Sequence, residues 1–199
     1  MKNLLLALAA ILYSGMVFAQ KDSLSFDERD KYIYYKLVDQ PGANADTLYN
    51  RGLYFLTTAY PKKTLALSKS DKAAYSLTAV GSYMVSKKGL VSNSDGGSLS
   101  YILKIEVKES KYRFWLTDFV YQPYQRNRYG SSEPVPGGDI PLEKALSKLS
   151  KADFNACLDQ VLANSKQVGD KLKLYMLKVS SLVKKQEPKK VNKISTKDW

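Results

Sequence analysis

The sequence predicts an α+β protein in which amphipathic helices pack against a β-sheet. Three observations lead to this fold class. Apolar and charged residues alternate over 101–122 with a turn in the middle, residues 74–86 alternate in the same way, and residues 44–60 and 151–184 place apolar side chains three or four positions apart. Alternation is typical of strands with one buried face, and the longer spacing is typical of amphipathic helices.

The N-terminal segment 1–19 is expected to be a signal peptide and not part of the fold. Lys2 gives a positive start, residues 4–12 form an apolar run too short to span a bilayer, and Val17 and Ala19 are the small residues of a cleavage site. We therefore expect cleavage after Ala19 and a periplasmic or secreted protein. A retained N-terminal membrane anchor is the alternative; no later segment predicts a transmembrane helix.

The expected organisation after cleavage is a flexible N-terminus at 20–30, a single domain at 31–186 and a basic, disordered tail at 187–199. The full chain carries a formal net charge of +12. Outside the cytoplasm, such a charge favours anionic partners such as lipid head groups or acidic envelope polymers. The alternative is that the lysines only keep the protein soluble.

The composition argues against the common catalytic chemistries. The chain has no histidine, which removes Ser-His and Cys-His nucleophile pairs, His zinc ligands and His general bases. The single cysteine, Cys157, lies in a helical pattern and is expected to be a buried, unreactive thiol. The acidic residues show no calcium-loop spacing, so no metal or cofactor is predicted. A hydrolase that uses two carboxylates stays open as an alternative.

The first half of the domain is expected to contain a strand at 31–39 and a helix that Asn44 caps and Pro61 ends. The buried stripe of this helix is predicted from its spacing and consists of Leu48, Tyr49, Gly52, Leu53 and Leu56. A glycine within this stripe would allow close packing against a sheet.

A weak strand is predicted within 63–73, followed by the alternating strand at 74–86. Gly81 in that strand indicates a bulge or a bend. Flexible loops are predicted at 87–98 and 122–141, because both stretches are rich in turn-forming residues.

The segment 151–184 is the longest periodic stretch of the chain. Its apolar stripe contains Phe154, Leu158, Val161, Val168, Leu172, Tyr175, Val179 and Leu182, with Ser165 as a polar member. This spacing suits either a coiled-coil seam, which would serve assembly, or one amphipathic helix along a sheet. We favour the helix on the sheet.

The register of the hairpin at 101–122 divides its side chains into two faces. A turn of two or four residues gives one apolar face, on which Val107 faces Tyr112, Ile105 faces Phe114, Leu103 faces Leu116 and Tyr101 faces Asp118 at the rim. We expect Asp118 to accept hydrogen bonds at a strand end. The four-residue turn over 108–111 is favoured, because Glu109-Ser110 is a poor type I′ pair.

The other face of the hairpin carries the first candidate binding site. Glu106 faces Arg113 and Lys104 faces Trp115 in the same register. Trp115, Lys104 and Arg113 would form an aromatic platform beside two cations. The alternative is a cross-strand cluster that only covers the sheet, since such pairs contribute about 0.2–1 kcal/mol each without any ligand.

The second candidate binding site is the predicted loop at 120–130. Tyr121, Tyr124 and Tyr129 alternate there with Arg126 and Arg128. Tyrosine and arginine are enriched in binding hot spots. An ordinary solvated loop is the alternative.

Several stretches between residues 31 and 122 resemble a known family. They are Pro41-Gly42, Leu48-Tyr49, Tyr112-Arg113-Phe114 and Thr117-Asp118-Phe119. They resemble the secreted bacterial family called domain of unknown function 4468, which has a TBP-like fold. The resemblance implies a curved antiparallel sheet with helices packed on one face and a cell-envelope or secreted location, and it implies no activity. Glu109-Ser110 departs from the tighter, glycine-containing turn of such families.

These observations together predict an exported, non-catalytic binding module. Its expected partner is an anionic or glycan envelope ligand, a lipid head group or another envelope protein. Nucleic acid is not expected, because the signal peptide directs the protein out of the cytoplasm. Assembly through the long C-terminal helix is the alternative function.

Overall fold

The computed structural model describes residues 24–88 and 93–177. The strands of this part are β1 (Ser25–Phe26), β2 (Tyr32–Asp39), β3 (Leu65–Asp71), β4 (Ser76–Lys88), β5 (Asn93–Lys108), β6 (Lys111–Arg126), β7 (Ser132–Pro134) and β8 (Ile140–Pro141). The helices are α2 (Ala45–Thr58), the 3-10 helix η1 (Leu142–Ser147) and α3 (Lys151–Leu177). The predicted signal peptide, the end of the predicted long helix and the basic tail lie outside the described residues.

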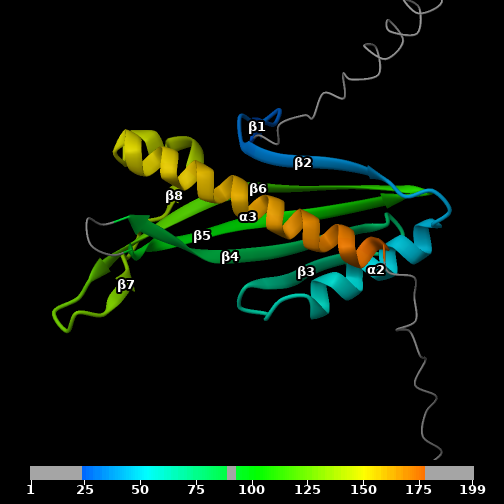
Figure 1. Ribbon diagram of the computed structural model, residues 1–199, viewed down its shortest axis with the longest axis horizontal. Coiled ribbons are helices and arrows are strands. Elements are labelled where there is room, and N and C mark those ends of the chain that lie inside the picture. The colour runs from blue at the N-terminus through cyan, green and yellow to red at the C-terminus, as the bar shows by residue number, and fades with distance from the viewer. Residues whose placement is uncertain (1–23, 89–92, 178–199) are drawn as a thin grey trace, which may run out of the picture.

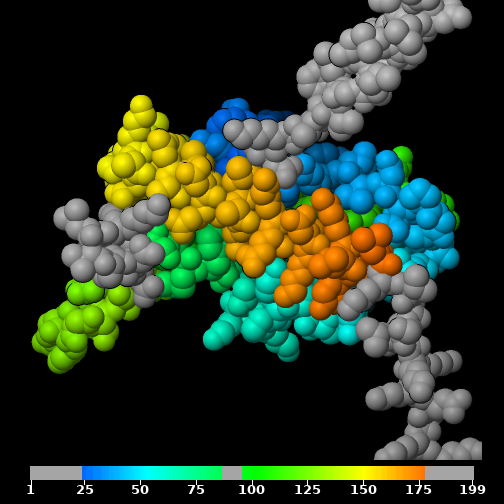
Figure 2. Space-filling view, in the orientation of Figure 1, coloured from blue at the N-terminus to red at the C-terminus, as the bar shows by residue number. Residues whose placement is uncertain are grey.

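The strands form one antiparallel sheet in the order β1-β2-β6-β5-β4-β3, and β7 and β8 also pair with β6. Helices α2 and α3 lie on the same face of this curved sheet (Figure 1). Figure 2 shows that face, with α3 crossing it diagonally and α2 beside the C-terminal end of α3. The architecture is the predicted α+β class, a curved sheet with helices on one face and a long C-terminal helix.

Local sequence determines where α2 begins. The side chain of Asn44 accepts a hydrogen bond from the backbone N–H of Thr47 at 2.7 Å, which makes Asn44 the predicted N-cap. Gly52 faces the sheet, and a Cβ at this position would lie 3.0 Å from Leu77 Cδ1. The missing side chain therefore lets α2 approach the sheet closely. The buried face includes Phe55, which the predicted stripe omitted, and Leu53 is half-buried.

The apolar stripe of α3 is buried against the sheet and is not free to form a coiled-coil seam. Val161, Val168 and Leu172 are 2% exposed or less. A Cβ on Gly169 would lie 2.7 Å from Cζ of Phe114, so the glycine lets the helix rest on that ring. The predicted helix laid along the sheet is confirmed, and an assembly through this helix would need another surface.

The predicted register of the hairpin is confirmed near its turn. Lys104 pairs with Trp115, Ile105 with Phe114, Glu106 with Arg113 and Val107 with Tyr112. The side chains of Ile105 and Phe114 are fully buried under the helices. One face of the hairpin is therefore core, as the alternation predicts.

The preferred four-residue turn is wrong, because Lys108 pairs with Lys111 and leaves a two-residue turn at Glu109-Ser110. Ser110 takes a φ of 58°, and the contacts that hold the turn come from residues 40–45, at the start of α2 and just before it. The N–H of Gln40 donates to the Ser110 carbonyl at 2.8 Å, and the carboxylate of Glu109 accepts from the N–H of Ala45 at 2.6 Å. These tertiary hydrogen bonds outweigh the poor turn propensity of the pair.

A β-bulge overturns the predicted pairing of Tyr101 with Asp118. Ile102 pairs with Thr117 but Ser100 pairs with Val120, so β6 contains one extra residue at this point. Asp118 takes a φ of 52° in the bulge. It therefore lies inside β6 and not at a strand end.

Gly81 is not the site of a bulge, because its pairing with Tyr101 and with Leu65 is regular. A Cβ at this position would lie 2.3 Å from Cζ of Tyr101. The glycine instead makes room for the Tyr101 ring, which lies across the strand and is 3% exposed.

The two long segments that were predicted as loops form strands over much of the length that the structure describes. The N-terminal segment is also partly ordered. Strands β4 and β5 extend into 87–98, and β6 continues to Arg126 where the loop 122–141 was expected. Neighbouring strands supply backbone partners there, as in the pairing of Ser98 with Gln122. This pairing overrides the turn-rich composition. Residues 24–30, expected to be flexible, include β1 and a hydrogen-bonded turn.

Replacing Gly81 with valine is expected to destabilise the protein by about 1–3 kcal/mol, because the new side chain overlaps the buried Tyr101 ring. Thr78→Val on the other face of the same strand is the control and is expected to change the free energy of unfolding by less than about 0.5 kcal/mol. Urea unfolding measures both values. Equal stability of the two variants would contradict this packing.

Replacing Ser110 with glycine is expected to stabilise the protein by about 0.5–1 kcal/mol, since glycine adopts the φ of 58° without strain. Ser110→Val is expected to lower stability, because a β-branched side chain is least tolerated at positive φ. Thermal melts of the two variants check this. A Ser110→Gly variant that melts below the native protein would show that the conformation is not strained.

Candidate binding face of the sheet

The face of the sheet that points away from α2 and α3 is called the open face here. Its side chains are the alternate residues of each strand, between the buried ones. Tyr35 and Leu37 on β2 are 46% and 56% exposed, and Val80 on β4 is 48% exposed, whereas the neighbouring core residues Leu103 and Phe114 are fully buried. No helix in the described part of the chain covers this face.

On the open face, Trp115 of β6 is the middle side chain of a row that crosses three strands. Tyr35 of β2 pairs with it on one side and Lys104 of β5 on the other. Lys104 Nζ lies 5.9 Å from the centroid of the indole ring, and Cζ of Arg113 lies 5.4 Å from it. Both distances suit cation–π contacts. The three residues of the first candidate site therefore lie together, as the hairpin register predicted.

The two cations beside the indole differ in their partners. Arg113 donates from Nε and Nη2 to one carboxylate oxygen of Glu106 at 2.8 and 2.5 Å. This hydrogen bonding raises the pKa of Arg113, so the guanidinium stays charged. Lys104 has no carboxylate partner within the described residues and can bind an external anion directly.

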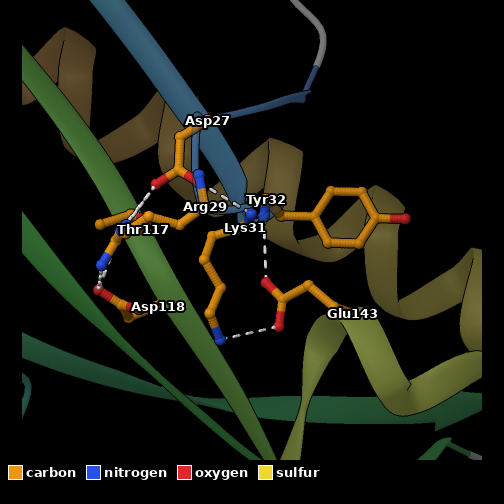
Figure 3. A network of polar contacts seen from close by, with 7 residues as sticks. All are labelled: Asp27, Arg29, Lys31, Tyr32, Thr117, Asp118 and Glu143. Carbon is orange, nitrogen blue, oxygen red and sulfur yellow. Dashed lines mark hydrogen bonds and ion pairs between the residues drawn. The ribbon is translucent and has the colours of Figure 1, made fainter.

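A turn at the N-terminal edge forms the wall of the open face (Figure 3). Arg29 Nη2 lies 2.7 Å from the Asp27 carboxylate and 3.4 Å from the Asp118 carboxylate, and it also donates to Thr117 Oγ1 at 3.3 Å. The bulge in β6 directs Asp118 toward this guanidinium. Arg29 therefore covers Thr117, which is only 1% exposed although it belongs to the open face.

The same turn is closed by Asp27. Its Oδ1 accepts the backbone N–H groups of Arg29 and Lys31, each at 2.9 Å. Burial raises the pKa of Asp27, but these hydrogen bonds and the Arg29 guanidinium outweigh it, so the pKa lies below its usual value. On the other side of the turn, Glu143 of η1 accepts from the N–H of Tyr32 at 3.0 Å and pairs with Lys31 (Figure 3).

Two shallow clefts lie on the open face, one on each side of Arg113. The first has a volume of about 430 Å³ and lies between the Arg29 turn, Lys104 and Trp115. The second, of about 200 Å³, extends to the hairpin turn and is lined by Leu37, Glu106, Lys108 and Lys111. Tyr35 and Arg113 line both clefts. The residues that bound this face from β2 and from the Arg29 turn were not predicted as site residues.

The second candidate site does not form one surface. Tyr121 is in the core, 7% exposed, and its hydroxyl donates to the carbonyl of Gly96 at 2.6 Å. Tyr124 and Arg126 lie on the last part of β6, where β7 pairs with them. Arg128 stacks on Tyr129 at 5.0 Å beyond the strand. Extension of β6 through the expected loop is the reason that Tyr121 points inward.

Neither a cluster of metal-ligating side chains nor an ionised thiol is found in residues 24–88 and 93–177. No cluster of three or more His, Cys, Asp or Glu residues that could hold a metal ion occurs among them. Burial raises the pKa of Cys157 to about 11, so the thiol is protonated at neutral pH. Neither α2 nor α3 combines the length and the apolar character that crossing a bilayer would require.

An antiparallel sheet with helices on one face and an open opposite face defines the class of TBP-like α+β domains. Residues 34–122 match the model of the family described as domain of unknown function (DUF4468) with TBP-like fold. This match is to the family that the sequence resembles, and it covers most of the stretch from β2 to β6.

Two solved structures are similar in fold. A DUF4468 family protein from Bacteroides ovatus ATCC 8483 superposes with a TM-score of 0.58 at 11% identity, over 79% of this chain and 92% of that chain. A TBP-like protein from Parabacteroides distasonis ATCC 8503 gives a TM-score of 0.52 at 16% identity, over 72% of this chain and 93% of that chain. No curated protein matches the sequence.

Replacing Asp27 with asparagine is expected to lower stability at neutral pH by about 1 kcal/mol, because the charged acceptor of the turn is lost. Since the folded-state pKa is lowered from 3.8, the contribution is complete above that pH and disappears as the pH falls through the folded-state value. Melting temperatures of the native and variant proteins should therefore converge as the pH is lowered well below 3.8.

Asp30→Asn, at an exposed position of the same turn, is the control and is expected to leave the pH profile unchanged. A difference between the native and Asp27→Asn proteins that persists at low pH would show that the charge of Asp27 is not what stabilises the turn.

Proposed function

We propose that this protein is an exported, non-catalytic binding protein whose open face binds an acidic glycan. The observation that carries the proposal is the row of Tyr35, Trp115 and Lys104, with Arg113 against the same indole. Aromatic rings present apolar faces on which sugar rings can stack, and the two cations can pair with sugar carboxylates. The combination suits a ligand that is both ring-shaped and anionic.

The exposure of these side chains supports the proposal. Trp115 is half-buried, and its neighbours Tyr35 and Leu37 are 46% and 56% exposed, so apolar surface is left in water beside the indole. The core is already formed on the other face of the sheet, so folding does not need these rings where they are. An exposed aromatic group rimmed by charged residues is typical of a ligand or partner site.

The carboxylates of the open face support binding rather than hydrolysis. Glu106 is held by Arg113, and Asp27 is held by Arg29. The pKa of Asp27 lies below its usual value, whereas an acid catalyst needs its proton at neutral pH. These groups are therefore suited to accepting hydrogen bonds from sugar hydroxyls.

Export would bring the protein within reach of such a ligand. The positive start, the apolar run at 4–12 and the small residues before position 20 support a signal peptide. Acidic polymers are common partners for a chain with a net charge of +12, and electrostatic attraction raises the rate of encounter. The periplasm or the extracellular space is the proposed location.

Replacing Trp115 with alanine is expected to weaken binding of an acidic polysaccharide by at least about tenfold, the loss of roughly 1.4 kcal/mol typical of a binding hot spot. Calorimetric titration with polygalacturonate and alginate, with neutral dextran as the control ligand, measures the effect. Trp115→Phe is expected to keep most of the affinity, because the stacking surface remains.

The matched control is the double variant Arg126→Ala/Arg128→Ala. It removes one cation at the C-terminal end of β6 and one just beyond that strand. It is expected to bind as the native protein does, apart from a small change that salt removes. Binding that survives Trp115→Ala but not the double variant would move the site to the β6–β7 arm and refute the proposal.

A further inference from the structure

We infer that the ligand of the open face is a linear acidic polysaccharide that runs along β6 and occupies both clefts, with Lys108 and Lys111 binding an acidic unit beyond the one held at Lys104 and Trp115. This inference rests on the proposed function and specifies its ligand. It requires that the two clefts be adjacent along β6, that the lysines at the hairpin turn form no ion pairs within the described residues, and that the surface suit a sugar acid.

The two clefts are adjacent because they share side chains. Tyr35 and Arg113 line both, whereas Glu106 on β5 lines only the second. Residues two apart on a strand lie about 7 Å from each other on the same face. Trp115, Arg113 and Lys111 therefore present an aromatic ring and two cations in a line about 13 Å long.

The lysines at the hairpin turn have no structural partner. Lys108 and Lys111 are directly opposed across the two-residue turn, and like charges in that position are destabilising. Neither makes an ion pair within the described residues. Asp39, which pairs with Lys111 in the register of β2 and β6, forms no ion pair either. An acidic ligand group beside these ammonium groups would relieve their repulsion.

The carboxylates on the same surface favour a sugar acid over a nucleic acid. Asp27, Glu28 and Arg29 line the first cleft, and Glu106 lines the second. Carboxylates accept hydrogen bonds from sugar hydroxyls, which an acidic polysaccharide carries on every unit and a DNA backbone lacks. A surface of alternating charge therefore fits a polymer that carries both hydroxyls and carboxylates.

A chain also fits the shape better than a small ligand does. Both clefts are shallow and open on the same face of a sheet. A single sugar would touch one cleft and leave most of its surface in water. A linked second unit binds the other cleft at high effective concentration, so that affinity rises with chain length.

The test is a length series of oligogalacturonates from the dimer to the octamer. Trp115 fluorescence reports binding in a Trp199→Phe background, in which Trp115 is the sole tryptophan. The affinity of the native site is expected to rise at least about tenfold between the dimer and the hexamer and then to level off. Lys108→Ala/Lys111→Ala is expected to remove this rise and to leave dimer affinity within about twofold.

Lys62→Ala/Lys63→Ala is the matched control, because it removes the same charge from an exposed lysine pair outside both clefts. It is expected to keep the length dependence. Thermal melts of both double variants should match that of the native protein.

The outcomes separate the inference from the proposed function. The linear ligand would be overturned if the dimer and the hexamer bound with equal affinity that depends on Trp115. It would also be overturned if the two lysine double variants lost affinity for the hexamer equally. Either result would leave the proposed function intact. Tighter binding of an oligothymidylate than of any oligogalacturonate would overturn it in favour of nucleic acid. Absence of binding at every length would overturn both.

Discussion

The antiparallel pairing of β6 with β5 on one side and β2 on the other is the interaction on which the rest of the structure depends. Strand alternation then sends Phe114 and Leu116 into the core and Arg113 and Trp115 to the open face. A shift of one residue would exchange the two sets. The helices stabilise the correct register, because Gly169 of α3 rests on the ring of Phe114.

The helices cover one face of the sheet, and no helix of the described residues covers the other. The contacts on the open face are cross-strand pairs such as Lys104 with Trp115, which contribute only about 0.2–1 kcal/mol each. Most of the stability comes instead from apolar burial between the sheet, α2 and α3. Side chains on the open face can therefore serve ligand binding at little cost to folding, and the Arg29 turn anchored to Asp118 bounds that face at one edge.

Local patterns predicted those features that depend on near neighbours in the chain. The Asn44 cap and the register of Lys104 with Trp115 are such features. The predicted turn at Glu109-Ser110 was wrong because hydrogen bonds that the backbone N–H groups of Gln40 and Ala45 donate to it decide its conformation. Tyr121 was misplaced for a similar reason, since strand pairing extends β6 through a stretch whose composition is typical of a loop.

The sequence by itself determined the α+β class, the two faces of the hairpin and the grouping of Lys104, Arg113 and Trp115, because alternation and short-range register depend only on residue order. Only the tertiary structure decided which strand lies beside Trp115 and what bounds the face. Tyr35 and Arg29 reach β6 from 80 and more positions away, as in the contact of Arg29 with Thr117 at a separation of 88. No periodicity encodes contacts at that range, because they form only when helices and strands pack together.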